Sequence, residues 1–320
     1  MSATAFDRVL PAEVADRVDR YRQEKIDRLD SVLRDLPGCR PWGDVAAEDL
    51  PLRYALAHHV FEGVSRAAEQ GDAERVADLL RLRADQSALR PAHEAGGPVL
   101  VADPPRSAFT DDRALAASPV ALVDPVVAAS ASPAVRDLVS HALATAVDSG
   151  FGATVSRNSR VVVLIARRRA TDTSIRSWTT NALPATVHLD YFAEHEYVGR
   201  DLIHEAAHTE LNDLFAAHGV ALPDEVAYYA PWLETERPVF GFLHGTWAFS
   251  HVALYCEWLA GAAVPADVRA LASAMHAKYA EHMHQARSDF DRAIRWVRAE
   301  PVAELITACR DRVLGSFDPV

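Results

Sequence analysis

Two histidines four residues apart, His204 and His208, lie at the ends of the pentapeptide HEAAH. The surrounding residues, 198–217, are mostly apolar and favour a helix, on which residues four apart share one face. Both imidazoles could therefore ligate one divalent cation, and Glu205 projects from nearly the same side. This H-E-x-x-H arrangement is typical of metal-binding helices. It specifies neither the metal nor the reaction, and a pair of surface histidines on an ordinary helix is the alternative.

A catalytic metal needs a third protein ligand and open coordination positions, and the sequence leaves three candidates for that ligand. His244 follows Gly241 at the expected start of a later helix, and it is the favoured one. Glu257, on the same expected helix, would complete the two-histidine, one-glutamate set of thermolysin-like zinc peptidases. An ordinary carboxylate paired with an arginine is the alternative for Glu257. His218 is expected to lie beyond the end of the first helix and is the least favoured.

Two further residues are candidates for catalytic roles. Glu205 would be the general base that activates metal-bound water if the metal were a hydrolytic zinc ion. In an oxygenase it would hold a water, orient a ligand or contact the substrate. His251 lies seven residues after His244, on the same helix face, and it is expected to orient a ligand or the substrate without binding the metal.

Three short segments downstream of the motif add specificity: APW at 230–232, RP at 237–238 and LHG at 243–245. With the pentapeptide they resemble the H-E-x-x-H-motif proteins of peptide natural-product clusters, described as 2-oxoglutarate-dependent iron peptide β-hydroxylases. The resemblance covers roughly residues 150–262 and leaves the first half of the chain unmatched. It implies Fe(II) in place of Zn(II), with 2-oxoglutarate and O₂ as co-substrates.

Binding of the implied co-substrate would require further residues. Three protein ligands leave three positions open on iron, two for 2-oxoglutarate and one for O₂. The distal carboxylate of 2-oxoglutarate needs a cation, and the planar fork of an arginine pairs with a carboxylate through two hydrogen bonds. Arg237 is the first choice and Arg176 the reserve, while an ordinary loop ion pair is the alternative for Arg237. Thr180, Tyr228 and Tyr229 are expected to add hydroxyl contacts.

Three functions follow as hypotheses. The first is an Fe(II)/2-oxoglutarate oxygenase that hydroxylates an unactivated carbon, the β-carbon of an amino-acid residue, in a peptide or small-molecule substrate. The second is a zinc metallopeptidase in which His204, His208 and Glu257 bind Zn(II) and Glu205 is the general base. The third is a non-catalytic module that holds a leader peptide, its metal site vestigial.

Composition excludes some classes of partner. The 320 residues are 49% hydrophobic and carry a formal net charge of −12, which argues against nucleic acid and anionic membrane surfaces. Three widely spaced cysteines suit a reducing cytoplasm better than a disulfide framework. With neither a secretory leader nor an apolar stretch long enough to span a bilayer, a cytoplasmic protein is expected. The oligomeric state is left open.

The periodicity of apolar residues predicts an α+β fold, mostly helical, with a small central sheet packed on a metal-binding helix and a C-terminal helical cap. Helices are expected over 11–36, 50–83 (two helices separated near 71), 118–148, 198–217, 244–262, 265–298 and 301–314. Strands are expected over 99–102, 161–166, 174–180 and 186–191, with 185–191 at an edge beside the metal-binding helix, and a loop over 219–238. Residues 1–150 would form an N-terminal helical region and 151–320 the catalytic region, in what could be one continuous domain.

Overall fold

The N-terminal helices follow the predicted apolar stripe. In the computed structural model, which describes residues 9–86, 91–92, 99–104, 131–169 and 176–316, helix α1 spans Ala12–Arg34 and buries Val14, Val18, Ile26 and Leu33. A short helix, α2 (Asp44–Glu48), leads to α3 (Leu50–Glu69) and α4 (Ala73–Ala84). The side chains of Asp49 and Asp72 accept hydrogen bonds from backbone N–H groups in the first turns of α3 and α4, which fixes where both helices begin.

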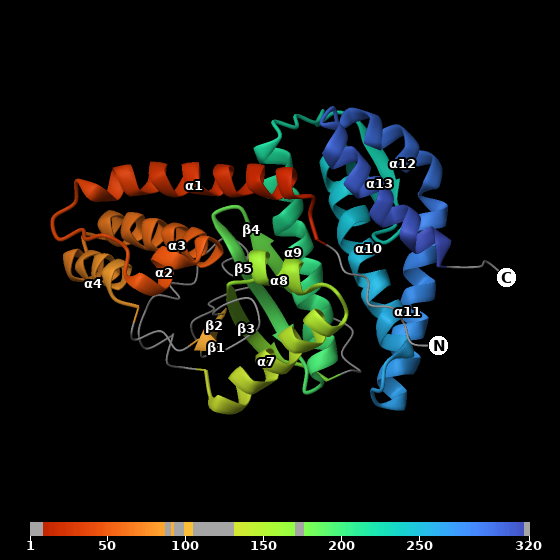
Figure 1. Ribbon diagram of the computed structural model, residues 1–320, viewed down its shortest axis with the longest axis horizontal. Helices are drawn as coiled ribbons and strands as arrows, with labels where there is room; N and C mark the ends of the chain where they lie inside the picture. The colour runs from red at the N-terminus through yellow and green to blue at the C-terminus, as the bar shows by residue number, and fades with distance from the viewer. Residues whose placement is uncertain (1–8, 87–90, 93–98, 105–130, 170–175, 317–320) are drawn as a thin grey trace.

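A small mixed sheet occupies the centre of the molecule (Figure 1). Within the described residues its strand order is β1-β2-β3-β5-β4. The bounds are Pro91–Ala92 for β1, Val99–Ala102 for β2, Val161–Arg167 for β3, Ser177–Thr180 for β4 and Leu183–Tyr191 for β5. Strands β2, β3 and β5 are parallel, and β1 and β4 pair antiparallel at the two edges. The predicted residues 174 and 175 of the β4 strand lie outside the described residues.

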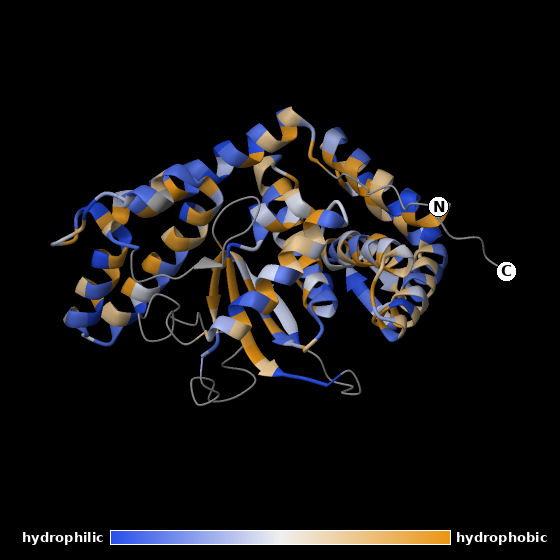
Figure 2. Ribbon diagram, turned by 60° about the horizontal axis from the view of Figure 1, so that its bottom comes forward, coloured by the Kyte–Doolittle hydropathy of each residue, from blue (hydrophilic) through white to orange (hydrophobic). Residues whose placement is uncertain are grey.

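Helices cover both faces of this sheet. Ala55 of α3 packs against Val161, Val163 and Ala185 on one face. The other face packs against α7 (Pro133–Asp148), α8 (Gly152–Asn158) and α9 (His195–Ala217). Figure 2 shows the resulting hydrophobic centre, with apolar strands enclosed by helices whose outer surfaces are hydrophilic. Two-sided burial explains why β3, VVVLIAR, reads as a nearly continuous apolar run.

The expectation that 185–191 is an edge strand was wrong. Strand β5 pairs with β3 on one side and with β4 on the other, and its residues are buried up to Asp190. The edge is the short, half-buried strand β4, because a tight turn at 181–182 folds the chain back and places β4 outside β5. The strand nearest the histidines is therefore formed by residues 177–180.

The C-terminal part is a helical cap, as predicted, with three corrections to its elements. Helix α10 (Val239–Gly261) begins five residues before the expected 244, directly after its N-cap Pro238, so His244 lies in its second turn. The expected helix over 265–298 divides at Ala286 into α11 (Ala266–Gln285), α12 (Arg287–Ala293) and the 3₁₀ turn η2 (Ile294–Trp296). The expected loop contains a hairpin, β6 (Ala227–Ala230) and β7 (Thr235–Pro238), and α13 (Glu300–Gly315) closes the described chain.

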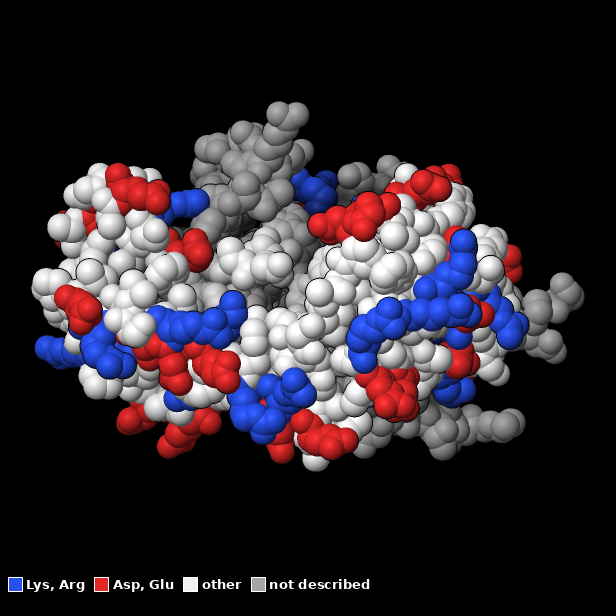
Figure 3. Space-filling model, turned by 90° about the horizontal axis from the view of Figure 1, so that it is seen from above, with Lys and Arg blue, Asp and Glu red and all other residues white. Residues whose placement is uncertain are grey.

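The two expected regions share one core. Val14 and Val18 of α1 belong to the same hydrophobic cluster as residues of α9, α10 and α13. Strand β2, from the first half of the chain, pairs with β3 from the second. Helix α7 confirms the later part of the expected 118–148 helix, and residues 118–130 lie outside the described ranges. None of the helices in the described ranges has the length and apolar character needed to cross a membrane. Figure 3 shows acidic and basic side chains interspersed over the face seen from above.

Candidate metal centre

Helix α9 presents its polar residues in two adjacent rows with four-residue spacing. One row holds His204, His208 and Asn212, and the other holds Glu205 and its four-residue neighbours Thr209 and Asp213. Most of α9 is buried, since it packs against the sheet on one side and against α7, α8 and α10 on the others. Polar side chains on such a buried helix need hydrogen-bond partners or a cavity to face. Residues of these two rows have hydrogen-bond partners, and others face a cavity.

The two motif histidines converge. Their Nε2 atoms are 3.3 Å apart, and the ring of His204 stands edge-on to that of His208. At a metal–nitrogen distance of about 2.1 Å, neighbouring ligands of a tetrahedral or octahedral ion are about 3.0–3.4 Å apart. The pair therefore fits two ligand positions of one ion, as the spacing in the motif predicts.

His244 of α10 joins this pair from the opposite wall. Its Nδ1 lies 3.2 Å from Nδ1 of His208, and the two rings are stacked. Because His208 faces His204 through Nε2 and His244 through Nδ1, the three imidazoles do not converge on one point. Accordingly, no group of three or more His, Cys, Asp or Glu side chains in the described ranges is arranged to hold a metal ion.

One atom of His244 indicates how a third ligand could be supplied. The side chain is 7% exposed, and its Nε2 is buried without a hydrogen-bond partner among the described residues. An unsatisfied buried imidazole nitrogen is costly unless it finds a partner, and a metal ion is one. The converging nitrogens of His204 and His208 fit two ligand positions, and the buried Nε2 of His244 in the same cavity is the candidate for a third.

These side chains line a cavity of about 390 Å³, which we call the histidine cavity. Its walls come from β4, the turn after it, α9 and the start of α10. The lining residues are Ser177, Trp178, Thr179, Asn181, His204, Glu205, His208, Asn212, Phe240 and His244. A cavity of this size accommodates a small-molecule ligand.

Glu205 is held in the wall of the histidine cavity. It is 3% exposed, and its Oε1 accepts a hydrogen bond of 2.6 Å from the hydroxyl of Ser177. The same oxygen lies 3.9 Å from Nε2 of His204. Burial raises the pKa of Glu205 to about 8, the hydrogen bond from Ser177 opposes that shift, and the nearby Asp201 adds to it. Glu205 is thus placed to contact a molecule or ion that binds at the histidines.

The three histidines are neutral at physiological pH. Burial is the largest cause, lowering the pKa of His204 to about 4 and that of His208 to about 3. Arg200 adds to the shift at His204, and His204 adds to it at His208. The pKa of His244 is likewise well below its ordinary value through burial and the neighbouring His208. Neutral imidazole is the form that binds metal ions.

His251 lies away from the histidine cavity. It is fully buried between α9 and α10, where its Nδ1 is 2.7 Å from the carbonyl oxygen of Trp247. Its Nε2 is 3.9 Å from a carboxylate oxygen of Glu210 on α9. The contact with Glu210 joins α9 and α10, the two helices that carry His204, His208 and His244. The role of His251 in orienting a ligand stays a prediction.

Neither arginine predicted to hold 2-oxoglutarate lines the histidine cavity. Arg237 is exposed on β7, and its guanidinium lies beside Gly241, where a Cβ atom would come within 3.1 Å of its Nε. Arg176 precedes β4, and its Nε is 3.4 Å from the buried carboxylate of Asp190, which also binds Arg168 at 2.8 Å. Their predicted role is not supported by these positions and stays a prediction.

The other candidate ligands lie far from the histidine pair. Glu257 is 13 residues after His244, about 20 Å along α10, and its carboxylate is 3.8 Å from Arg312. His218 is the C-cap of α9, ten residues past His208 and so about 15 Å away along the helix.

The expected hydroxyl contacts are also elsewhere. The Tyr228 hydroxyl accepts a hydrogen bond from the Trp296 indole, at 3.2 Å, and Tyr229 is 47% exposed. Neither lines the histidine cavity, whereas Thr180 lines a neighbouring one.

Several lining residues were not anticipated from the sequence. Asn212 could have been, because it continues the four-residue spacing of His204 and His208. Ser177 and Asn181 reach the cavity only through the pairing of β4 with β5, and Phe240 only because α10 begins before the predicted position. No local pattern marks these three.

No protein-family model matches the chain, and no curated protein matches it significantly. What the site can do is therefore argued from its own residues. These are two converging imidazole nitrogens, a third histidine with an unsatisfied nitrogen, and a buried carboxyl group on one cavity wall.

Proposed function

We propose that this protein is an Fe(II)/2-oxoglutarate-dependent oxygenase that hydroxylates an unactivated carbon, the β-carbon of an amino-acid residue, in a peptide or small-molecule natural product. The observation that carries the proposal is the meeting of His204, His208 and His244 in one cavity. When bound, Fe(II) supplies oxygen activation: O₂ and 2-oxoglutarate yield succinate and CO₂ while one oxygen atom enters a C–H bond of the substrate.

The third candidate ligand is a histidine and not a glutamate, which favours this reaction over peptide hydrolysis. A thermolysin-like peptidase would need Glu257 beside the motif histidines. Glu257 is instead half-buried near Arg312 at the far end of α10. Three nitrogen donors suit iron as well as zinc and leave positions open for two co-substrates. The resemblance of the motif segments to iron peptide β-hydroxylases adds support from the sequence.

The remaining cavity residues are suited to binding and orienting a polar substrate. The side-chain amides of Asn181 and Asn212 and the hydroxyl of Thr179 are among the cavity-lining groups. Trp178 and Phe240 provide aromatic walls. Glu205, fixed by Ser177, holds β4 against α9 and presents a carboxyl group next to His204.

The cellular setting is part of the proposal. Cys39, Cys256 and Cys309 form no disulfide bond. Cysteines outside disulfides are typical of a reducing compartment, and we place the protein in the cytoplasm. The substrate class we propose is a peptide or an amino-acid-derived small molecule, because the histidine cavity is polar and of small-ligand size.

The test is anaerobic reconstitution with Fe(II), followed by 2-oxoglutarate, with the visible spectrum recorded at each addition. The expected result is a metal-to-ligand charge-transfer band in the unmodified protein and in the control variants His218→Ala and Glu257→Gln. His244→Ala should lose the band and most of its iron affinity, while circular dichroism and the melting temperature of the metal-free form show that it folds.

Two results would contradict the proposal. If His244→Ala binds iron and develops the band as the unmodified protein does, His244 is not a ligand. If the unmodified protein retains zinc tightly and gives no band with iron, the peptidase hypothesis is favoured, and Glu205→Gln then becomes the informative variant.

A further inference from the structure

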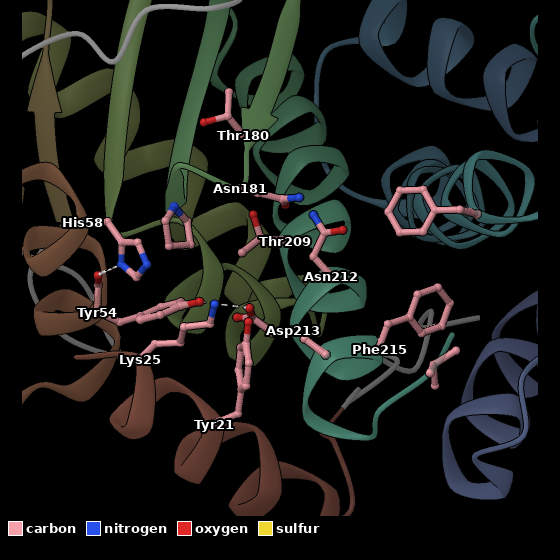
Figure 4. A pocket seen from close by; sticks show the side chains of 14 residues that line it. Tyr21, Lys25, Tyr54, His58, Thr180, Asn181, Thr209, Asn212, Asp213 and Phe215 are labelled. Atoms are coloured by element: carbon pink, nitrogen blue, oxygen red, sulfur yellow. Dashed lines mark hydrogen bonds between the residues drawn. The ribbon is translucent and has the colours of Figure 1, made fainter. Parts of the chain in front are cut away.

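A second cavity, of about 330 Å³, adjoins the histidine cavity. The two share Asn181, Asn212 and Phe240 in their walls. Its other walls come from α1, α3 and α9, including Lys25 and Tyr54, so the N-terminal helices help to enclose a space that adjoins the histidine cavity. Figure 4 shows side chains from these three helices pointing toward one another. We call this space the lysine cavity.

The lysine cavity continues along the helix that carries the motif. Asn212 is one turn beyond His208 on α9, and Asp213 and Ala216 follow it on the side of the helix that lines this cavity. One turn of helix is about 5.4 Å. A ligand with one end at His208 therefore reaches the lysine cavity with a chain of only a few carbon atoms.

The carboxylate in this cavity is already paired. Arg22 is fully buried and donates from Nε to one oxygen of Asp213 at 2.8 Å, and the Tyr54 hydroxyl donates to the other oxygen at 3.2 Å. Arg22 also binds the side-chain oxygen of Asn158 and the backbone oxygen of Arg157. The Arg22–Asp213 pair thus forms a neutral wall and does not present a free carboxylate to an ammonium ligand.

Lys25 is the cation that faces the lysine cavity. Its ammonium lies 5.6 Å from the centre of the Tyr21 ring, and it has no ion-pair partner among the residues that the structure describes. Burial lowers the pKa of the neighbouring His58, although the hydrogen bond between its Nδ1 and the carbonyl oxygen of Tyr54 opposes that shift, so His58 is neutral at physiological pH. The charged side chains among the described lining residues are Lys25 and Asp213, and because Arg22 neutralises Asp213, the positive charge of Lys25 remains.

We propose that the lysine cavity is a carboxylate-binding subsite in which Lys25 pairs with a carboxylate of a ligand that extends from the histidine cavity. Among the described residues no Lys or Arg lines the histidine cavity itself, so a carboxylate bound there would have to reach Lys25. The amides of Asn181 and Asn212 and the hydroxyls of Thr180 and Thr209 supply hydrogen bonds beside the ammonium.

The carboxylate could come from two sources, the distal end of 2-oxoglutarate or a carboxylate of the substrate. The assignment of the carboxylate to one of these sources rests on the proposed oxygenase function. The binding of a carboxylate at Lys25 does not depend on that function. The chain offers an unusually clean test, because Lys25 and Lys278 are its only lysines and Lys278 is exposed on α11.

The first experiment uses the metal-free protein and glutarate, a five-carbon dicarboxylate that lacks the keto group. Calorimetry should show binding that is about 10- to 100-fold weaker in Lys25→Met, the loss expected for a charge-assisted hydrogen bond. Lys278→Met should bind as the unmodified protein does, and Lys25→Arg should retain part of the affinity. Glutarate should also slow reductive methylation of Lys25, read by mass spectrometry, without slowing that of Lys278. Equal glutarate affinity, or its absence, in all four proteins would overturn the subsite.

The second experiment identifies the source of the carboxylate. Anaerobic Fe(II) protein is titrated with 2-oxoglutarate, and the charge-transfer band gives the affinity. A weaker affinity in Lys25→Met assigns the distal carboxylate of 2-oxoglutarate to Lys25. An unchanged affinity, together with weaker glutarate binding, assigns Lys25 to a substrate carboxylate. If no band forms in any protein, the oxygenase proposal fails, while the glutarate result still decides the subsite.

Discussion

The hydroxyl of Ser177 donates a hydrogen bond of 2.6 Å to Oε1 of Glu205, and this bond joins the edge strand β4 to the motif helix α9. Strand β4 is otherwise held by its pairing with β5 alone among the described strands. The bond therefore sets the position of one cavity wall relative to the histidines. It also gives a hydrogen-bond partner to the carboxyl group of Glu205, a residue that is 3% exposed.

Ser177→Ala should lower the free energy of unfolding by about 1–3 kcal/mol, the cost of leaving a buried polar group without its partner. Urea denaturation at fixed pH measures the effect. Ser156→Ala is the matched control, because the Ser156 hydroxyl donates only to the backbone oxygen of Ala153 within its own helix. Equal stabilities for the two variants would show that the bond to Glu205 contributes little.

Gly245→Ala and Gly241→Ala should have opposite effects, although both glycines lie on α10, one turn apart. A Cβ at position 245 would lie 2.4 Å from Nε1 of Trp232, so the indole must move, and crowding of this kind costs about 1–3 kcal/mol. A Cβ at position 241 meets only the flexible end of Arg237, at 3.1 Å. There the higher helix propensity of alanine should raise stability by up to about 1 kcal/mol.

Thermal unfolding of both glycine variants measures these effects. Since Gly245 follows His244, Gly245→Ala should also weaken binding of divalent metal, whereas Gly241→Ala should leave it unchanged. A Gly245→Ala protein with unchanged melting temperature would mean that Trp232 is not packed against this turn.

The sequence was sufficient for features encoded by local spacing. The positions of His204, Glu205 and His208 on one face follow from the helix period, and the structure places them as expected. Strands β2 and β3 and helices α1, α3, α4 and α9 agree with the apolar patterns to within a few residues. A local signal also separates the two helices expected over 50–83, because Asp72 caps the start of α4.

What the sequence did not reveal depends on pairing between distant segments. Nothing in residues 177–181 marks them as the strand beside the histidines, because their position follows from antiparallel pairing with β5. Lys25 lies 183 residues before His208, and it approaches the motif helix because the buried Arg22 binds Asp213. The sequence predicts carboxylate recognition by Arg237 or Arg176, whereas the residue proposed above for that role is Lys25 of the N-terminal helix.

Arg22→Met should destabilise the protein by about 3–5 kcal/mol, because it leaves the buried carboxylate of Asp213 without its countercharge. The control is Arg28→Met on the same helix. Arg28 pairs with Glu24 at 3.7 Å, and both side chains are largely exposed, so the expected loss is at most about 0.5 kcal/mol. Urea denaturation of both variants tests the difference, and a small loss for Arg22→Met would mean that α1 is not anchored through this pair.

Protonation of His59 should contribute to acid destabilisation. His59 is 2% exposed, its Nε2 lies 2.9 Å from the hydroxyl of Thr186, and burial lowers its pKa to about 3. The unfolded chain, in which a histidine pKa is about 6.5, therefore binds the proton more readily, so stability present above pH 6.5 is lost as the pH falls toward 3. Between pH 7.5 and 5.5 this residue should account for a loss of about 1–1.5 kcal/mol.

His59→Gln keeps a hydrogen-bonding group beside Thr186 and removes the titration, so its stability should fall less steeply between pH 7.5 and 5.5 than that of the unmodified protein. Other buried histidines, including His188, His204 and His208, keep part of the pH dependence. Thr186→Val provides the control, because it removes the hydrogen bond but leaves His59 buried. It should lower stability at both pH values while preserving the slope. If His59→Gln and Thr186→Val show the same slope, protonation of His59 does not contribute to acid unfolding.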